Sequence, residues 1–477
     1  MNSSRVDSLR QANSRLAQGD YSLWGPLATD VARERLGWLD LPERSRALLP
    51  SLDALSAWAR SAGINRIVLS GMGGSSLAPE VIASTYHRDL ILLDSTHPDD
   101  VRAVLTPDPD HTIFVIASKS GETIETRSHL HAISARIESA GLVLRDHLVV
   151  ISDPGSPLTN WAIEQELRHF VGETDVGGRF SALSIFGLLP AALLGIDCAM
   201  LLDDASDMRK RLLVASPENP AVALADQILA QQPFLALPDR PLSDWIEQLV
   251  AESTGKSGVG IIPIITSDER VDPVTESAMS WPLGAAFYLW EWATALLGFA
   301  LSVNPFDQPN VASAKAATAA VLAGDTRKES ALALTSQAAL ALVDHMPADD
   351  CGYIGMLAFV PMRDKAMRQT MYEIRQGLQD RFRLAEKEVT LGFGPRYLHS
   401  TGQCHKGGPP LGAFLLITLD SPSDYPIPGE SYTFATLLKA QALGDYFTLV
   451  EIGRPVVHAH LTHDELRRFS QSLHVAS

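Results

Sequence analysis

Short apolar runs alternate with helical stretches between residues 65 and 152 of this chain. Four of these runs predict strands, at Arg66–Ser70, Leu90–Asp94, Thr112–Ala117 and His147–Ser152. Each run is almost continuously apolar, which is typical of a parallel strand covered by helices on both faces, whereas a strand with one wet face alternates. The pattern therefore predicts a doubly wound α/β fold.

Two further α/β patterns follow along the chain. The first begins near residue 216 and predicts strands at Phe234–Leu237 and Val259–Ile265, with a helix around Trp245–Glu252 between them. The second predicts helices at 329–345 and 365–384 and strands at 353–360, 389–391, 414–419 and 456–460. We divide the chain into a helical segment, two parallel-sheet domains and a smaller C-terminal α/β domain, at 1–60, 61–215, 216–328 and 329–477.

The longest apolar stretch, Leu283–Val303, is close to membrane-spanning length but contains Glu291. A charge in the middle of a bilayer is costly, so we interpret this stretch as a buried helix of a globular protein. The first twenty residues are polar and lack the apolar core of a secretory signal. We therefore expect a cytoplasmic protein with no membrane partner.

Composition narrows the class of ligand. The chain has 477 residues and a formal net charge of −17, which argues against nucleic acid or an anionic lipid surface as a partner because binding to those depends on clustered Lys and Arg. Cys198, Cys351 and Cys404 form no Cys-x-x-Cys pair and give no support to a disulfide framework or a zinc site. A small phosphorylated metabolite needs only one local anion-binding site.

Two turns rich in glycine and hydroxyl groups each follow a predicted strand and precede a predicted helix. They are 71–76 (Gly-Met-Gly-Gly-Ser-Ser) and 118–123 (Ser-Lys-Ser-Gly-Glu-Thr). Glycines let the main chain approach an anion, hydroxyls donate to its oxygens, and the free N–H groups of a helix start add a favourable dipole. Ligands of parallel sheets bind at the carboxyl ends of strands, where both turns fall. The turns predict a phosphate site.

Two other interpretations of these turns are open. Gly71-x-Gly73-x-x-Ser76 approximates a dinucleotide fingerprint, and Asp94 ends the next predicted strand. The third glycine of that fingerprint is replaced by Ser76, however, and a dinucleotide gives the second turn no role. The purely structural alternative is two tight turns without a ligand.

Glu252 is the candidate catalytic base. Asp244 and Glu247 resemble a capping box and Gly255 resembles a C-terminal stop, which together place Glu252 in the last turn of a helix. There the negative end of the helix dipole disfavours the charged form of the carboxyl group. Gln248 lies one turn earlier on the same face, placed to orient a substrate hydroxyl. The alternative for Glu252 is an ordinary surface glutamate.

Three more polar residues are candidates. Arg179 follows Gly177 and Gly178, which let the main chain pass close to a ligand, and its guanidinium is suited to stabilise a developing oxyanion. Its alternative role is a structural ion pair. Gln308 and Lys315 are seven residues apart, so two helical turns would place both on one face. Taken alone, Lys315 would be a solvated surface lysine.

Five motifs together resemble successive signatures of the glucose-6-phosphate isomerase family. They are 71–75 (Gly-Met-Gly-Gly-Ser), 118–123, 177–181 (Gly-Gly-Arg-Phe-Ser), 248–256 (Gln-x-x-x-Glu-Ser-x-Gly-Lys) and 304–315 (Asn-Pro-Phe-Asp-Gln-Pro, ending in Lys). With the segment 396–403 (Arg-Tyr-Leu-His-Ser-Thr-Gly-Gln), the chain looks most like the isomerase half of bacterial transaldolase/glucose-6-phosphate isomerase fusions. We expect no transaldolase half before Met1.

The resemblance implies two sugar-isomerase (SIS) domains, at 61–215 and 216–328, and interconversion of glucose 6-phosphate and fructose 6-phosphate without metal or cofactor. Glu252 would move a proton between C2 and C1 through a cis-enediolate that Arg179 stabilises. Gln248 and Gln308 would position hydroxyls, and Lys315 would assist at the ring oxygen. The residues implied to hold the 6-phosphate are Gly74, Ser75, Ser118, Lys119 through its main chain, Ser120 and Thr123.

Histidines depart from the family order. The family's ring-opening histidine stands between the glutamate and the Asp-Gln-Pro motif, but residues 253–310 contain none. We assign ring opening to His399, with His405 as the second choice and a role for neither histidine as the alternative. In the family this histidine comes from a neighbouring subunit, so the resemblance implies a homodimer; the alternative is that the C-terminal domain supplies the histidine within one chain. A further cluster, His458, His460 and His463, we interpret as a solvated strand edge rather than a metal site, because no carboxylate or cysteine stands at ligand spacing.

Two alternative functions stay open. One is a dual phosphoglucose/phosphomannose isomerase, since mannose 6-phosphate differs only at C2. The other is a non-catalytic SIS regulator that binds a sugar phosphate. No basic helix-turn-helix segment is visible, and a regulator has little need of a helix-terminal glutamate beside an arginine.

Overall fold

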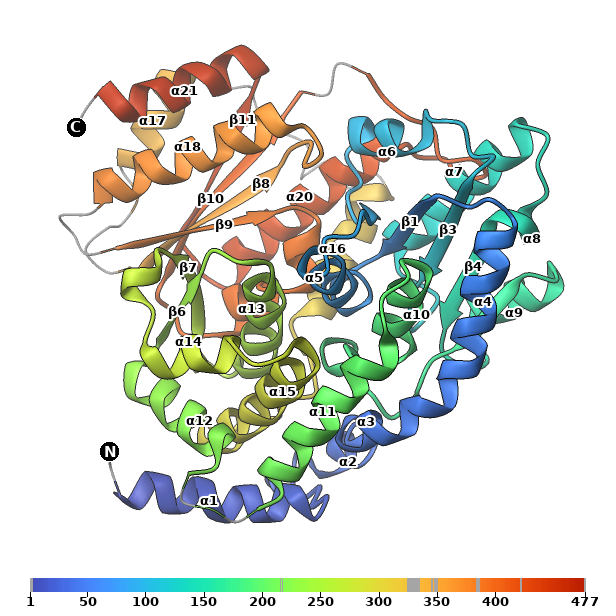
Figure 1. Ribbon diagram of the computed structural model, residues 1–477. Helices are drawn as coiled ribbons and strands as arrows, with labels where there is room; N and C mark the ends of the chain where they lie inside the picture. Colours follow the sequence, from blue (N-terminus) through green and yellow to red (C-terminus); the bar gives the residue numbers. More distant parts are fainter. Residues whose placement is uncertain are drawn as a thin grey trace. The chain divides into compact units, whose positions relative to one another are not determined.

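The computed structural model describes residues 3–214, 216, 218–323, 335–344, 346, 351–382, 387–420 and 423–475. The chain forms two compact units (Figure 1). Unit 1 comprises Met1–Asp94 and Asp108–Asp307, and unit 2 comprises Ser95–Pro107 and Gln308–Ser477. Both are built on parallel sheets, so the predicted α/β class is confirmed.

Unit 1 contains a five-stranded parallel sheet of order β2-β1-β3-β4-β5. The strands are β1 (Arg66–Gly71), β2 (Ile91–Leu93), β3 (Thr112–Ala117), β4 (Leu148–Ser152) and β5 (Arg168–Val171). The first four confirm the predicted strands. Every residue of β3 and β4 is buried, as expected of strands with helices on both faces.

Strand β5 was not predicted. It lies at the edge of the sheet, and its four residues alternate between half-buried and exposed. An edge strand of the sequence Arg-His-Phe-Val offers no continuous apolar run, so the criterion that finds the central strands misses it.

The rest of unit 1 is largely helical. A two-stranded parallel sheet, β6 (Phe234–Pro238) with β7 (Ile262–Thr266), flanks α13 (Pro241–Thr254) in the sequence. The apolar helix α15 (Leu283–Ala300) packs against α11 (Cys198–Leu212), α12 (Pro220–Gln231) and α13. Although α15 is long and apolar enough to cross a membrane, 89% of it is buried in the protein, which confirms the predicted buried helix.

Helix α13 begins earlier than predicted. Its N-cap is Arg240, which makes no side-chain cap, and Pro241 occupies the first turn. Asp244 therefore lies inside the helix, so the predicted capping box of Asp244 and Glu247 is wrong. Proline at the first helical position starts the helix because its fixed φ suits the first turn and its missing N–H costs nothing there. The predicted stop at Gly255 is confirmed as the C-cap.

Unit 2 contains a four-stranded parallel sheet of order β11-β10-β8-β9. The strands are β8 (Tyr353–Phe359), β9 (Glu388–Phe393), β10 (Gly412–Leu419) and β11 (Val456–Leu461), all near their predicted positions. Helix α20 (Phe434–Glu451) packs on β10 and β11 and on α16 (Val311–Leu322), while α18 (Lys365–Phe382) packs on β9. Of the helix predicted at 329–345, Ser336–Asp344 is seen as α17, and 329–334 and 345 lie outside the described residues.

The four predicted segments do not map one to one onto the two units. Residues 1–60 and the two predicted sheets up to Asp307 fall in unit 1, because α15 packs on helices from both predicted domains. Residues 95–107, with α6 (Pro98–Leu105), fall in unit 2. The finer division into four domains stays a prediction.

The packing of α15 on α11 is tight enough to test. A Cβ atom at Gly284 would lie 1.9 Å from the carbonyl oxygen of Leu201, so Gly284→Ala must push the two helices apart. We expect the free energy of unfolding to fall by about 1–3 kcal/mol. All eight tryptophans lie in unit 1, so urea denaturation followed by tryptophan fluorescence reports on this unit. Ser277→Ala, at an exposed position of α14 (Pro273–Met279), is the control; equal stability of the two variants would contradict the close packing.

Candidate active site

The two phosphate-type turns start from neighbouring strands. In the parallel pairing of β1 with β3, Gly71 is opposite Ala117, so the two strands end together at one edge of the sheet. The turn 71–76 leads into α5 (Leu77–Thr85), and the turn 118–123 leads into α7 (Ile124–Ser139). The prediction that both turns fall at the carboxyl ends of parallel strands is confirmed.

Glycine is required in the first turn. Gly73 has φ +56°, a conformation that favours glycine. A Cβ atom at Gly74 would lie 2.0 Å from the carbonyl oxygen of Gly178, so the short helix η3 (Gly73–Ser75) packs directly on η4 (Gly178–Phe180). This contact brings the first turn beside Arg179. Gly74 thus has a packing role in addition to the substrate-binding role that the sequence implies.

The second turn presents hydroxyl groups at the start of α7. Ser118 Oγ donates to Thr123 Oγ1 at 3.1 Å, and Ser120 Oγ accepts from the N–H of Glu122 at 3.2 Å. Thr123 is the N-cap of α7 but makes no side-chain cap bond, so its hydroxyl does not occupy the N–H groups of the first turn. The hydroxyls of Ser118, Ser120 and Thr123 thus lie together at the start of α7.

The side chain of Lys119 does not contribute to anion binding at this turn. Its ammonium donates to Asp153 Oδ1 at 2.7 Å and to the carbonyl of Glu173 at 2.8 Å. The ammonium group is therefore already bound to two protein acceptors. This agrees with the expectation that Lys119 contributes only its main chain. Burial raises the pKa of Glu173, whose carboxyl group stands near this lysine.

Arg179 is buried, with 5% of the residue exposed, and is held by four contacts. Nη1 lies 3.1 Å from Glu252 Oε1. Nε donates to Ser253 Oγ at 2.8 Å, and Nη2 donates to the carbonyls of Pro305 and Asp307 at 2.5 and 2.9 Å. Burial lowers the pKa of Arg179, and the carboxylates of Glu252 and Asp307 oppose that shift. The guanidinium is fixed rather than free to rotate.

Glu252 lies in the last turn of α13, as predicted, and is 5% exposed. Gln248, one turn earlier, donates from Nε2 to Glu252 Oε2 at 3.1 Å. The two carboxylate oxygens therefore have different partners, Arg179 on one side and Gln248 on the other. The predicted pairing of Gln248 with Glu252 on one helical face is confirmed, and Glu252 is not a surface glutamate.

Lys256 is a site residue that sequence reasoning did not select. It is 4% exposed, its ammonium lies 2.7 Å from Asp307 Oδ1, and it also donates to the carbonyl of Asn304. Burial, reinforced by the nearby charge of Arg179, lowers the pKa of Lys256 to about 7. The available signal was its place just after the C-cap Gly255, where a cation meets the free carbonyls of a helix end.

The other predicted site residues, Gln308, Lys315 and His399, belong to unit 2. Gln308 and Lys315 are exposed, Lys315 on α16. His399 is half-buried at the end of the short helix η8 (Arg396–His399). Their meeting with Glu252 and Arg179 stays a prediction.

His405, the second choice for ring opening, is part of the core of unit 2. Its ring packs against the rings of Tyr353, Tyr397 and Phe414, and burial lowers its pKa to about 3. It is therefore neutral at physiological pH. His399, by contrast, is half-buried and keeps access to solvent, and the choice between the two histidines stays a prediction.

Known proteins match part of this chain. Residues 51–233 match the model of the phosphoglucose isomerase family, a region that includes both turns and Arg179 but ends before Gln248 and Glu252. The glucose-6-phosphate isomerase of Thermus thermophilus is 34% identical over 236 residues, 46% of this chain and 56% of the relative. That of Rippkaea orientalis is 35% identical over 205 residues, 39% of each chain. The chain spans about half the length of the curated relatives it matches.

A solved structure supports the fold. A glucose-6-phosphate isomerase from Chlamydia trachomatis is similar with a TM-score of 0.50 and 19% identity, over 62% of this chain and 75% of that one. Over these regions the chain is similar to glucose-6-phosphate isomerases in sequence and in fold. The finer resemblance to transaldolase fusions stays a prediction.

The buried ammonium of Lys256 predicts a pH-dependent stability. In the unfolded chain Lys256 holds its proton up to the ordinary value of 10.5, but in the folded protein it releases the proton above about pH 7. Between these values the unfolded state binds more protons, so the free energy of unfolding rises with pH. We expect the difference in unfolding free energy, wild type minus Lys256→Met, to rise by about 1 kcal/mol per pH unit from about pH 7.5 to 9, measured by urea denaturation.

Lys210→Met is the control for this experiment. Lys210 is exposed, and its pKa is raised by its hydrogen bond to Asp207, so it keeps its proton throughout the range. Its difference from wild type should therefore not change with pH. A flat difference for Lys256→Met as well would mean that this ammonium stays charged in the folded protein.

Proposed function

We propose that this chain is an aldose–ketose isomerase that interconverts glucose 6-phosphate and fructose 6-phosphate. The observation that carries the proposal is the buried contact of Glu252 with Arg179, next to a turn of the phosphate-binding type. The similarity of residues 51–233 to the phosphoglucose isomerase family supports the same reaction class.

The phosphate end of the substrate would lie at the carboxyl edge of the five-stranded sheet. Ser75, Ser118, Ser120 and Thr123 supply hydroxyls, and the main chain of Lys119 and the first turn of α7 supply N–H groups. Such neutral donors suit a phosphate because several short hydrogen bonds and a helix dipole act on one anion. Together these hydroxyl and N–H groups form a phosphate cradle. The cradle determines which end of the sugar is held, and Glu252 acts at the other end.

Glu252 would act as the base. The proton on C2 of the open-chain aldose is acidified by the neighbouring carbonyl, so a single carboxylate can remove it and return it to C1 of the cis-enediolate. Arg179, beside Glu252, is positioned to stabilise the negative oxygens of that intermediate, and its four contacts hold the guanidinium in place before the charge develops. No redox step is needed.

The remaining roles complete the proposal. Gln248 and Gln308 orient substrate hydroxyls, while Lys315 and His399 handle ring opening. The substrate is a small molecule, the compartment is the cytoplasm, and a homodimer is the expected assembly. The reaction as written uses the chain's own acids and bases, so we propose no metal or cofactor for it.

An enzyme explains the site better than a sugar-phosphate sensor does. Placing Glu252 and Arg179 together in the interior removes both charges from water, which is costly unless the pair is needed. A sensor would require the phosphate turns but not this pair. The burial of both groups therefore favours a catalytic function.

Glu252→Gln separates catalysis from binding. The amide keeps the shape and can still accept a hydrogen bond from Arg179, but it cannot take up the C2 proton. We expect kcat to fall about a thousandfold in a coupled assay with fructose 6-phosphate. The dissociation constant for fructose 6-phosphate, from calorimetry, should change less than about threefold, because the cradle is intact.

Glu247→Gln, on the same helix, is the matched control and should keep wild-type turnover. Circular dichroism establishes that each variant is folded. A Glu252→Gln enzyme with near-normal kcat would remove Glu252 from the reaction, and an equal loss of binding and turnover would place it in the binding site instead.

Ser118→Ala and Thr123→Ala test the cradle. Each removes one donor to the charged phosphate, so we expect KM for fructose 6-phosphate to rise about tenfold with kcat nearly unchanged. Ser139→Ala, at the opposite end of α7, removes an exposed hydroxyl that bonds only to the helix and should have no effect on KM. A fall in kcat at constant KM would place the phosphate elsewhere.

A further inference from the structure

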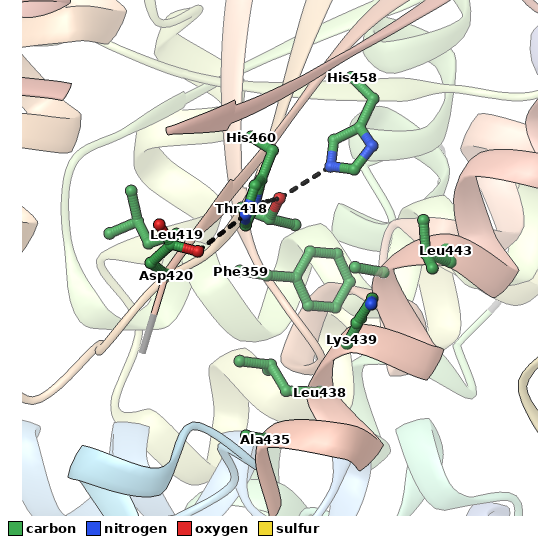
Figure 2. Close-up of a pocket in the computed structure, with 11 residues that line it drawn as sticks. Phe359, Thr418, Leu419, Asp420, Ala435, Leu438, Lys439, Leu443, His458 and His460 are labelled. Carbon is green, nitrogen blue, oxygen red and sulfur yellow. Dashed lines mark hydrogen bonds and ion pairs between the residues drawn. The ribbon is translucent and has the colours of Figure 1, made fainter. Parts of the chain in front are cut away.

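Unit 2 has a cavity of its own. It measures about 250 Å³ and lies at the carboxyl end of the sheet, where β8, β10 and β11 finish, against helix α20 (Figure 2). Its walls are mainly apolar, with polar side chains from β10, β11 and α20. The lining residues are Phe359, Thr418, Leu419, Asp420, Ala435, Leu438, Lys439, Ala442, Leu443, His458 and His460.

Four polar side chains form a hydrogen-bonded chain along this cavity. The hydroxyl of Thr418 lies 2.7 Å from His458 Nε2 and 2.8 Å from His460 Nδ1. His460 Nε2 lies 3.0 Å from Asp420 Oδ1. Figure 2 shows Thr418 between the two imidazoles, with the second nitrogen of His458 turned away from Thr418. The two histidines are thus connected through one hydroxyl group.

Chemistry fixes the donor and the acceptor of each hydrogen bond between these four side chains. A carboxylate only accepts, so His460 Nε2 carries a proton toward Asp420. If His460 is neutral, its Nδ1 must accept, and the single proton of Thr418 is donated to it. Thr418 then accepts from His458 Nε2–H, which leaves His458 Nδ1 as an acceptor. If His460 gains a proton at Nδ1, the two bonds through Thr418 reverse, while His460 Nε2 still donates to Asp420, and His458 Nδ1 becomes a donor.

The solvated-edge interpretation of these histidines was therefore incomplete. Strand β11 is at the edge of its sheet, but His458 and His460 are only half exposed and line a cavity. Among the residues the structure describes, no three ligating side chains are placed to hold a metal ion. The carboxylate that spacing did not reveal, Asp420, comes from the neighbouring strand.

The chemistry of the walls limits the ligand. Phe359, Leu438 and Leu443 favour an apolar body, which a hexose phosphate does not have. Lys439 offers one ammonium group. When His460 is protonated and the bonds through Thr418 are reversed, His458 Nδ1–H offers one further donor. Two donors match the two oxygens of a carboxylate, whereas the lining residues that the structure describes include no arginine and no glycine turn of the kind that binds phosphate.

We propose that this cavity binds a small monocarboxylate with an apolar or aromatic body, and that one proton is taken up from the solvent for each anion bound. The carboxylate accepts from Lys439 and from His458 Nδ1–H, and the added proton rests on His460, beside Asp420. No covalent bond forms or breaks. The proposal does not depend on the proposed isomerase reaction.

The groups that face His458 and His460 agree with this proton uptake. Residues alternate along β11, so both histidines point to the α20 side, and Ala459 and Leu461 point to the core beneath α21 (His463–Val475). From α20, Lys439 lines the cavity and the ring of Tyr446 lies 5.6 Å from that of His458. Asp420, the residue just after β10, bonds to His460. Burial, helped by His460, lowers the pKa of His458 to about 4, so His458 relays the proton but does not keep it.

Benzoate is the probe for the test, with benzamide as its neutral isostere and phenyl phosphate as the other anion. With the full-length protein in calorimetry, we expect benzoate to bind at least tenfold more tightly than benzamide and more tightly than phenyl phosphate. Lys439→Met should weaken benzoate about tenfold. Lys365→Met, an exposed lysine of α18 outside the cavity, should leave it unchanged.

Proton uptake gives a second, independent readout. Benzoate stays ionised from pH 8 to 6, so tighter binding at lower pH reports a proton taken up by the protein, by up to about tenfold per pH unit. Thr418→Val keeps the volume but removes the relay, and the pH dependence should disappear. In protein labelled with ¹⁵N-histidine, benzoate should move the ring proton of His458 from Nε2 to Nδ1, assigned with His458→Gln and His460→Gln.

Several results would overturn the proposal. Equal affinity for benzoate and benzamide, or equal effects of Lys439→Met and Lys365→Met, would exclude an anion site in this cavity. Tighter binding of phenyl phosphate would exclude the carboxylate class. Leu443→Trp, which fills the cavity, should abolish benzoate binding while isomerase turnover stays normal; retained binding in a variant shown by its thermal unfolding to be folded would place benzoate elsewhere.

Discussion

The interaction on which unit 1 depends is the buried pair of Arg179 and Glu252. Two charges removed from water are stable only if every remaining donor and acceptor is used, and breaking such a pair typically costs about 3–5 kcal/mol. The protein meets this demand from several segments. A glycine-led turn supplies the guanidinium, the end of α13 supplies Glu252 and Ser253, and the segment after α15 supplies two carbonyls. Their relative positions are therefore coupled.

Much of this arrangement could be predicted from local sequence. Central strands such as β3 are continuously apolar, and the spacing of Gln248 and Glu252 puts both on one helical face. Strand β5 and the start of α13 were missed because an edge strand has no apolar run and because Pro241, rather than an acidic residue, begins the helix. Local sequence patterns therefore identify a strand best when both of its faces are buried.

The burial of single polar residues could not be predicted in the same way. Lys256 follows a glycine at a helix end, where a lysine is ordinarily solvated, and only the tertiary fold brings Asp307 and the carbonyl of Asn304 to it. His458 and His460 were recognised as part of a histidine cluster at a predicted strand edge. Their partner Asp420 is 40 residues from His460 and is brought close by strand pairing alone. Such contacts depend on register between strands, which spacing within one strand does not contain.

The charges of the site explain why the predicted phosphate cradle is built from neutral groups. Arg179 and Lys256 are matched by Glu252 and Asp307, so these four side chains have no net positive charge even when Lys256 is protonated, and the ammonium of Lys119 is bound to Asp153. An anion at the ends of β1 and β3 must then be held by hydroxyls, by main-chain N–H groups and by the dipole of α7. Because these neutral groups hold the phosphate, Arg179 does not have to bind it. Under the proposed function, the charge of Arg179 is then available beside Glu252, as stabilising an oxyanion that exists only during the reaction would require.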